Sequence, residues 1–422
     1  MAGPSDEILK TVARTLVRLE DLLDRLPLNV AKDFRSRIGT LRTVLLEKRP
    51  PALVLVGRRG AGKSSLVNAL FGAKVAELGH VAAQTGRARW YDYERGGGTM
   101  SILDTRGMQE GSAPAEGDPS KTAFESVAVE LRIRTPDLVL FVAKASEVDA
   151  AMEADLDALE KLYEAVRQAH RVEPPLVAIV THCDLLEPKS VLLHRPDRGA
   201  PDDVAEKLRH VALAEHVLSR KLDSRAGLHE RHVATLGVSA YMSFRTDGSL
   251  RGDERWRIED LATTLCRLLP ENGRAELARA TRARAVQEEL ATTLTKSMAA
   301  ICAAIAAAPV PIADIVLLTT LQSALVTGIA WIAGRSVDRK GTAEFLGGLG
   351  ANVGMAFVLR EAVRTLLKVV APGGASVVSA AIAFSGTMAV GSAARAYYIR
   401  GVSLANARRL FRAQRGKPKK GP

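Results

Sequence analysis

A glycine-rich turn between a short apolar run and a helical segment constrains this chain more than any other feature. The apolar run is Ala52–Val56, and three glycines lie in the six residues that follow it. Glycine lets the backbone turn its N–H groups inward around a phosphate chain, and the helix that begins next points its positive end at the same anion. The residues predicted to bind phosphate are Gly57, Gly60, Ala61, Gly62, Lys63, Ser64 and Ser65. In this spacing Lys63 contacts the β- and γ-phosphates and the Ser64 hydroxyl ligands Mg²⁺.

Between residues 50 and 272, short apolar runs alternate with segments of helical periodicity. This alternation predicts an α/β domain built on a parallel sheet. The predicted strands are Ala52–Val56, Met100–Leu103, Leu138–Val142, Leu176–Val180 and Val233–Val238, and the predicted helices include Asp149–His170 and Val204–Asp223. The glycine run 96–98 is typical of a hairpin tip.

Two segments after the glycine-rich turn carry groups suited to magnesium and to the terminal phosphate. Asp104 follows the predicted strand 100–103, where its carboxylate can hold Mg²⁺ through water, and the N–H of Gly107 can meet the γ-phosphate. Thr85, between the two motifs, is the candidate for a second hydroxyl ligand of Mg²⁺, and a solvated loop threonine is the alternative. The metal ligands are thus predicted at Ser64, Thr85 and Asp104, and the catalytic residues at Lys63, Thr85 and Gly107.

The segment after the predicted strand 176–180 has the position of a base-reading loop. Asp184 can accept two hydrogen bonds from the N1–H and the exocyclic amine of guanine, a pairing that adenine cannot offer. Thr181 and His182 supply a hydroxyl and a flat ring that could cover the base, although a loop histidine without base contact is the alternative. Ser239 and Ala240 follow the last predicted strand, where a backbone N–H would meet the guanine carbonyl oxygen.

With these motifs in this order, the chain resembles the Era-like branch of the translation-factor-class GTPases over about half its length. The resemblance implies a Ras-like P-loop NTPase fold, a domain that binds GTP and GDP, Mg²⁺ as the cofactor, and hydrolysis of GTP to GDP and phosphate. Met108 stands where many Ras-like enzymes carry a glutamine that orients the attacking water. We therefore expect slow intrinsic turnover that a partner or self-association stimulates.

The segments outside residues 50–272 are predicted to be helical. Residues 1–49 carry apolar side chains at steps of three and four and are interpreted as an N-terminal helical arm docked on the next domain, with a coiled-coil dimer as the alternative. Residues 273–296 are predicted to form a linking helix, residues 297–402 an all-α apolar domain, and residues 403–422 a basic tail.

The segment Pro309–Asp314 and the apolar run that follows it resemble the start of the YcjF-like domain of unknown function of bacterial inner-membrane proteins, over about residues 297–402. Residues 315–334 form a run of 20 uncharged residues and residues 369–394 a run of 26. About 20 apolar residues are enough to cross a bilayer as a helix. We expect membrane association of this domain, with the nucleotide-binding domain in the cytoplasm at the bacterial inner membrane; a buried core of a soluble helical domain is the alternative.

The charge balance favours anionic partners without selecting one. The net charge is +12 at neutral pH, which suits phosphates, acidic lipids or nucleic acid. Membrane lipid or a membrane protein is the preferred partner, with self-association also considered. RNA is less favoured because only 4% of residues are aromatic and could stack on bases. The remaining functional alternatives are an RNA- or ribosome-associated GTPase and a nucleotide-binding scaffold without hydrolysis.

Overall fold

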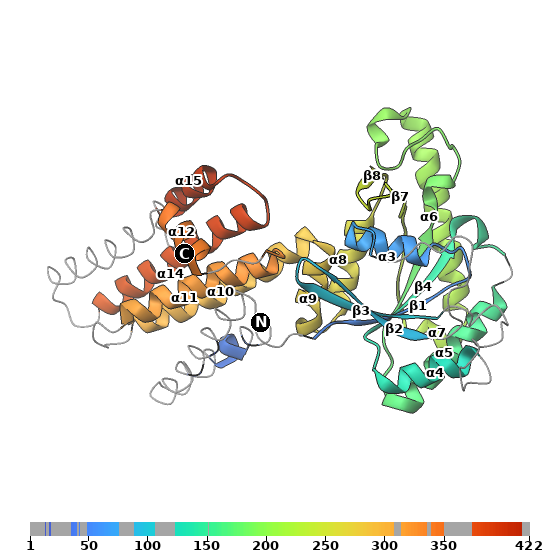
Figure 1. Ribbon diagram of the computed structural model, residues 1–422, viewed down its shortest axis with the longest axis horizontal. Helices are drawn as coiled ribbons and strands as arrows, with labels where there is room; N and C mark the ends of the chain where they lie inside the picture. Colours follow the sequence, from blue (N-terminus) through green and yellow to red (C-terminus); the bar gives the residue numbers. More distant parts are fainter. Residues whose placement is uncertain are drawn as a thin grey trace. The chain divides into compact units, whose positions relative to one another are not determined.

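The computed structural model describes residues 13, 17, 35–39, 42, 49–75, 88–105, 123–150, 152–307, 314–335, 339–349 and 374–415. The chain divides into two compact units (Figure 1). One is Pro50–Ala283, and the other combines Met1–Arg49 with Arg284–Pro422. The described residues 35–39 of the N-terminal arm, including the buried Ile38, thus belong to the helical unit and not to the α/β unit on which the arm was predicted to dock.

The α/β unit is built on a six-stranded sheet of order β2-β3-β1-β4-β5-β6. The strands are β1 (Ala52–Val56), β2 (Arg89–Arg95), β3 (Gly98–Asp104), β4 (Leu138–Lys144), β5 (Leu176–Thr181) and β6 (His232–Gly237). Only β2 runs antiparallel to its neighbour, so the sheet is mixed. Strands β1 and β5 are buried along their whole length, which explains why they read as continuous apolar runs.

Helices cover both faces of this sheet (Figure 1). On one face lie α4 (Ala123–Ile133), α5 (Glu153–His170), α6 (Pro201–Asp223) and α7 (Ala226–His229). The other face carries α3 (Lys63–Phe71), α8 (Ile258–Leu268) and α9 (Glu271–Thr281). Because successive strand residues point to opposite faces, Val54 and Phe141 join the core beneath α5, where Leu159 is fully buried.

The five predicted strands are all present, and the prediction of a purely parallel sheet was wrong at one edge. Strand β2 was missed because four of its seven residues are charged and the strand lies at the exposed edge of the sheet. A small hairpin of β7 (Met242–Phe244) and β8 (Leu250–Asp253) was missed as well. Both elements are too short or too polar to give an apolar signal.

The predicted linking helix 273–296 is two helices that belong to different units. Helix α9 ends at Thr281, followed by Arg282 in the left-handed conformation (φ 55°), and α10 (Arg284–Ala307) begins the helical unit. Glu276 of α9 accepts a hydrogen bond from the Thr99 N–H of β3 at 3.1 Å. The α/β unit therefore extends beyond the predicted boundary at 272, because α9 packs on the sheet.

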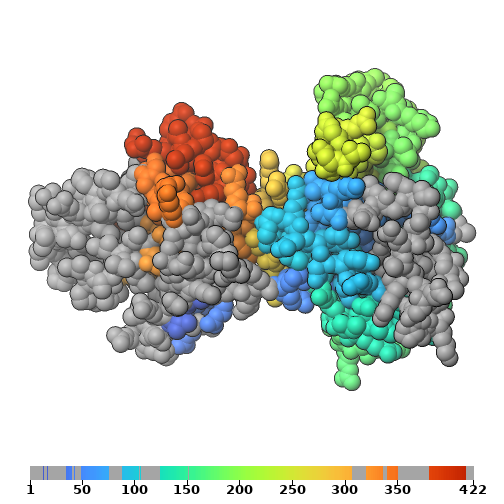
Figure 2. Space-filling view, viewed as in Figure 1, coloured from blue at the N-terminus to red at the C-terminus, as the bar shows by residue number. Residues whose placement is uncertain are grey.

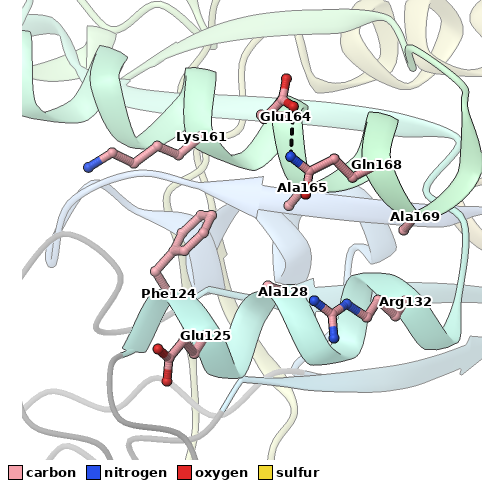
Figure 3. A pocket seen from close by; sticks show the side chains of 9 residues that line it. All are labelled: Phe124, Glu125, Ala128, Arg132, Lys161, Glu164, Ala165, Gln168 and Ala169. Carbon is pink, nitrogen blue, oxygen red and sulfur yellow. Dashed lines mark hydrogen bonds between the residues drawn. The ribbon is translucent and has the colours of Figure 1, made fainter.

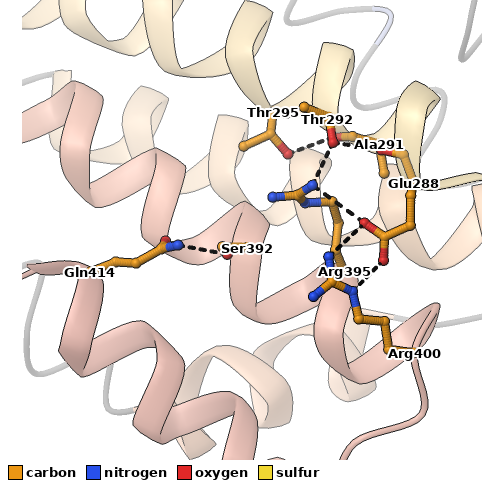
Figure 4. Close-up of polar contacts among 8 residues, drawn as sticks. All are labelled: Glu288, Ala291, Thr292, Thr295, Ser392, Arg395, Arg400 and Gln414. Atoms are coloured by element: carbon orange, nitrogen blue, oxygen red, sulfur yellow. Dashed lines mark hydrogen bonds and ion pairs between the residues drawn. The ribbon is translucent and has the colours of Figure 1, made fainter.

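The helical unit contains α10, α11 (Asp314–Ile332), α12 (Arg339–Gly348), α14 (Gly374–Tyr398) and α15 (Leu404–Arg415). Helices α10 and α14 approach closely: a Cβ placed on Gly391 would lie 2.2 Å from Thr295 Cγ2. A polar network joins them (Figure 4). The Glu288 carboxylate of α10 accepts hydrogen bonds from Arg395 at 3.4 Å and from Arg400 at 2.7 and 3.2 Å. The two helices are thus joined by close packing and by charge.

The prediction of a basic tail from residue 403 was wrong for its first part. Residues 404–415 form helix α15, which packs against α14 through the buried Ala407 and Phe411. Its Gln414 side chain donates a hydrogen bond to the Ser392 hydroxyl at 3.0 Å. Phe411 lies four residues after Ala407, on the same face of a helix. The sequence therefore contained the narrow apolar stripe of a helix, although arginine dominates its composition.

Helices α11 and α14 include most of the two uncharged runs at 315–334 and 369–394. A search of the residues that the structure describes found no helix both long and apolar enough to cross a membrane.

Candidate functional site

The glycine-rich turn leaves β1 at Gly57 and enters α3 at Lys63, as predicted for a strand–loop–helix unit. A Cβ on Gly57 would lie 2.3 Å from the carbonyl oxygen of Val142, so the loop passes against the neighbouring strand β4 with no room for a side chain. Gly60 and Gly62 have φ angles of 77° and 87°, in the left-handed region that glycine adopts at low cost. The local sequence therefore dictates the shape of the loop.

The start of α3 provides an anion-binding end. No side chain caps this helix, and its first turn carries no acidic residue. The ammonium of Lys63 folds back over the loop and donates hydrogen bonds to the carbonyl oxygens of Gly57 and, at 2.9 Å, of Arg58. N–H groups at a helix start, together with a lysine over the loop, are the groups that hold a phosphate chain.

The magnesium side of the site is described only in part. Asp104 ends β3 in register with Leu55 of β1, which brings it to the same edge of the sheet as the phosphate loop. Next to it, the buried Thr105 donates a hydrogen bond to the Leu55 carbonyl at 2.7 Å and fixes the exit of β3. The Asp104 side chain and the residues Thr85, Arg106, Gly107 and Met108 lie outside what the structure describes. The Ser64 hydroxyl and an aspartate at the adjacent strand end are the oxygen ligands that Mg²⁺ prefers.

Thr181 joins the predicted base loop, the segment that follows β5 and contains Asp184, to the phosphate loop Gly57–Ser64. It ends β5, is buried, and its hydroxyl lies 2.8 Å from the carbonyl oxygen of Ala61 and 3.2 Å from that of Ala143. The Nδ1 of His182 lies within hydrogen-bond distance of the same hydroxyl, at 2.9 Å. The Thr181 hydroxyl is therefore engaged with the protein backbone, away from the base it was predicted to cover.

His182 stands against the phosphate loop in a left-handed conformation (φ 58°). A Cβ on Gly62 would lie 3.1 Å from the Cε1 atom of His182. Burial lowers the pKa of His182, an effect that Asp184 opposes and Lys144 reinforces. The ring is therefore neutral near pH 7 and lies close to Gly62, the residue before α3.

The segment with the predicted residues Ser239 and Ala240 begins next to the end of β5. The Val238 N–H donates a hydrogen bond to the Val180 carbonyl at 2.8 Å. Ser239 exchanges two backbone hydrogen bonds with Trp256, so its own N–H is occupied. The Ser239 hydroxyl is fully buried and has no hydrogen-bond partner among the described residues. The contact predicted between a backbone N–H of this pair and a guanine carbonyl stays a prediction.

Arg58 lies within the phosphate loop, between Gly57 and Gly60. In the structure its guanidinium Nε lies 2.7 Å from Asp155, a carboxylate on α5 whose side chain is 3% exposed. Burial raises the pKa of Asp155, and the Arg58 charge opposes that shift. This ion pair anchors the outer side of the phosphate loop to α5.

Sequence reasoning missed Lys207, which contacts the base loop from α6. Its ammonium donates a hydrogen bond to the Asp184 carbonyl at 2.7 Å, and the side chain is fully buried. The signal was present: the buried residues of α6 are Lys207, Val211, Ala214, Leu218 and Leu222. A lysine therefore occupies a place on an apolar stripe with helical spacing, where a buried cation needs several acceptors.

A surface pocket of about 730 Å³ lies elsewhere, between α4 and α5 (Figure 3). Phe124, Arg132, Lys161 and Glu164 are among its lining residues, and Glu164 accepts a hydrogen bond from Gln168 across one turn of α5. None of the predicted nucleotide-site residues lines it. The candidate nucleotide site is therefore defined by the phosphate loop and the base loop and not by this pocket.

A family model described as "50S ribosome-binding GTPase" matches residues 52–181, which run from the first residue of β1 to the last of β5. Over this segment the chain matches a P-loop GTPase domain. The matched segment contains the phosphate loop, Asp104 and Thr181, whereas Asp184, Ser239 and Ala240 follow it along the chain.

Curated relatives cover the domain and some flanking sequence. The chain is 27% identical over 250 residues to "tRNA modification GTPase MnmE" of Xanthomonas oryzae pv. oryzae, which is 53% of this chain and 52% of that protein. It is 30% identical over 173 residues to "Uncharacterized protein YfjP" of Escherichia coli K12, which is 41% of this chain and 53% of the relative. The chain thus spans about half the length of these relatives.

Among solved structures, Toc33 from Arabidopsis thaliana in complex with GDP and Mg²⁺ is similar to this chain. The similarity covers 61% of this chain and 96% of the Toc33 chain, at 17% sequence identity and a TM-score of 0.36.

Proposed function

We propose that this chain binds GTP and GDP with Mg²⁺ at the loop Gly57–Ser64 and hydrolyses GTP to GDP and phosphate. The observation that carries the proposal is the hydrogen bond from Thr181 to Ala61, which holds the base loop against the phosphate loop. A phosphate loop alone would serve many nucleotides. Joined to Asp184, it gives one site with a phosphate end and a base-reading end.

In this proposal the described residues have distinct roles. The N–H groups at the start of α3 and the Lys63 ammonium hold the phosphates, and Asp184 accepts hydrogen bonds from guanine. Ser64 and Asp104 would hold Mg²⁺, which would supply positive charge against the negative charge that develops on the phosphates during transfer. Thr85 and Gly107 keep their predicted roles toward the metal and the γ-phosphate, and His182 its predicted place beside the base.

A base-exchange experiment tests the guanine assignment. Xanthine carries a carbonyl oxygen where guanine has its exocyclic amine, so an amide at position 184 matches xanthine better than a carboxylate does. We expect Asp184→Asn to bind GDP at least about tenfold more weakly and xanthosine diphosphate more tightly than the wild type. Asp197→Asn, at an exposed residue of the same unit, is the control. Tight GDP binding by Asp184→Asn would remove Asp184 from the base site.

We further propose that the chain is a slow switch, because Met108 replaces the glutamine expected for water activation. Turnover per molecule should then rise with protein concentration or with an added partner or membrane. Phosphate release measured over a hundredfold range of concentration, with and without vesicles, decides this. Fast turnover by dilute protein without lipid would contradict the proposal.

An anionic membrane surface is the proposed site of action, at the cytoplasmic face of the bacterial inner membrane. Helix α15 carries arginines 408, 409 and 412 on exposed positions and no acidic residue. Leu404 and Leu410 are also exposed, at 36% and 42%. Atoms of the C-terminal residues, coloured red, lie on the face shown in Figure 2. Cations next to exposed leucines match an interface of anionic headgroups over acyl chains.

Vesicle sedimentation tests the membrane proposal. The full chain should sediment with phosphatidylglycerol vesicles and much less with phosphatidylcholine vesicles. Replacing arginines 408, 409 and 412 together by glutamine should release it, whereas Arg198→Gln, at an exposed site of the other unit, should not. Release of the wild type by added RNA, with equal retention on both vesicle types, would favour the RNA alternative instead.

A further inference from the structure

Lys207 is a cation enclosed by backbone carbonyls. It lies in the second turn of α6, and its residue is 0% exposed. The ammonium donates hydrogen bonds to the carbonyl oxygens of Asp184 at 2.7 Å, Pro188 at 3.2 Å and Val191 at 2.9 Å. A lysine has three N–H donors, so all three are used.

The three acceptors lie on the stretch 184–191, which follows β5 and belongs to neither a strand nor an α-helix. Apart from the short 3-10 helix η2 (Cys183–Leu185), this stretch has no regular backbone ladder of its own. His210, one turn further along α6, also makes a hydrogen bond at 2.8 Å to the Glu187 carbonyl. The base loop is thus held from α6 at four carbonyls.

The charge of Lys207 is costly in this position. Burial lowers its pKa, while the nearby carboxylates of Asp184 and Glu187 oppose the shift. An apolar side chain would continue the stripe of Val211 and Ala214 without that cost, because a buried ion often contributes less stability than a packed hydrophobic residue. What an apolar side chain cannot do is fix the direction of three carbonyl groups at once.

We infer that Lys207 is a positioning residue that orients Asp184 for guanine and so sets base selectivity without touching the nucleotide. The inference rests on the proposed guanine site. The Asp184 carbonyl is bound to Lys207 while its carboxylate remains partly exposed for a ligand. When the carbonyl is fixed, the backbone of residue 184 is fixed, and the carboxylate enters the site along one direction.

Lys207→Met tests the inference, because methionine keeps the length and removes the three donors. We expect GDP affinity to fall at least about tenfold while ADP affinity stays within about twofold of the wild type, so that guanine selectivity is lost. Lys221→Met is the matched control on the same helix: the Lys221 ammonium bonds the Ala150 carbonyl at 2.6 Å, outside the base loop. An equal loss for GDP and ADP would show a merely structural lysine and overturn the inference.

A double-mutant cycle with Asp184→Ala asks whether Lys207 acts through Asp184. Once the carboxylate is gone, Lys207→Met should change GDP affinity by less than about twofold; two additive losses would contradict the positioning role.

If Lys207→Met does not fold, His210→Ala removes the side chain that bonds Glu187 and should reduce selectivity in the same direction by a smaller factor. Unchanged selectivity in His210→Ala would then count against the inference. A wild type without preference for GDP over ADP would refute the proposed function itself.

Discussion

At Gly57 the phosphate loop passes close to strand β4. An added Cβ would meet the Val142 carbonyl oxygen at 2.3 Å, and that oxygen belongs to a buried strand. Gly57→Ala must therefore move the loop or the strand. We expect unfolding free energy to fall by about 1–3 kcal/mol, with weaker GDP binding.

Urea unfolding and GDP titration measure the two effects of Gly57→Ala. The control is Gly386→Ala in α14, where no atom of the described residues lies within 4 Å of the added Cβ. Alanine in a helix interior is favoured over glycine by about 0.5–1 kcal/mol, so this change should be neutral or stabilising. A Gly57→Ala protein as stable as the wild type would show that the loop has room to move.

His182 makes stability depend on pH. Its pKa is lowered by burial from an ordinary value of 6.5, so below that pH the unfolded chain takes up a proton that the folded chain refuses. The contribution of His182 to stability is therefore complete above about pH 6.5 and declines as the pH falls toward the lowered folded pKa. Urea unfolding at pH 7.5, 6.5 and 5.5 should show a smaller decline for His182→Gln than for the wild type. If stability declines equally in the two proteins, the pH dependence comes from other groups.

At this scale, sequence identified residue types better than residue roles. Lys63 was selected from the glycine-rich motif, and Asp184 from its position after a predicted strand. Thr181 was predicted to face the base, but its hydroxyl is bound to the backbone, and Lys207 was not found at all. Both depend on contacts between residues far apart in the chain, such as Thr181 with Ala61, and a local pattern carries no information on such pairs.

Glu288 holds together α10 and the end of α14. Its side chain is 23% exposed and pairs with Arg395, which is 16% exposed. Glu288→Gln keeps the shape but leaves two arginines without their anion. We expect a loss of about 1–3 kcal/mol in the helical unit, because half-buried cations lose charged acceptors.

Amide hydrogen exchange in α10 and α14 measures this loss. Glu289→Gln is the matched control, since Glu289 is the exposed next residue on the same helix. Exchange should accelerate for Glu288→Gln and stay unchanged for Glu289→Gln. Equal behaviour of the two variants would mean that the ion pairs contribute nothing measurable.

Elements with a strong apolar pattern were the ones that sequence could predict. Strand β1 has the predicted bounds, and α5 and α6 lie where the helical periodicity placed them. Strand β2 was missed because an exposed edge strand needs no apolar run. The break at Arg282 was missed because alanine- and arginine-rich sequence favours helix on both sides of it, and tertiary packing of α9 on β3 decides where one helix ends.

The whole molecule consists of two units, and only Pro50–Ala283 contains the candidate site. A ligand that binds the folded state alone stabilises it, by about 2.7 kcal/mol at a hundredfold excess over the dissociation constant. GDP with Mg²⁺ should therefore slow amide exchange in β1, β4 and β5. The same concentration of ADP with Mg²⁺ should not. Equal protection by both nucleotides would point to phosphate binding without base reading.

The central claim is Mg²⁺-dependent hydrolysis of GTP at the loop Gly57–Ser64. The most direct test is phosphate release by the full chain with GTP or ATP, in Mg²⁺ or in excess chelator, beside Lys63→Ala and the control Lys161→Ala, a lysine of α5 outside the site. We predict slow release from GTP that needs Mg²⁺, is lost in Lys63→Ala and is kept in Lys161→Ala. Release that prefers ATP, or that survives in Lys63→Ala, would contradict the account.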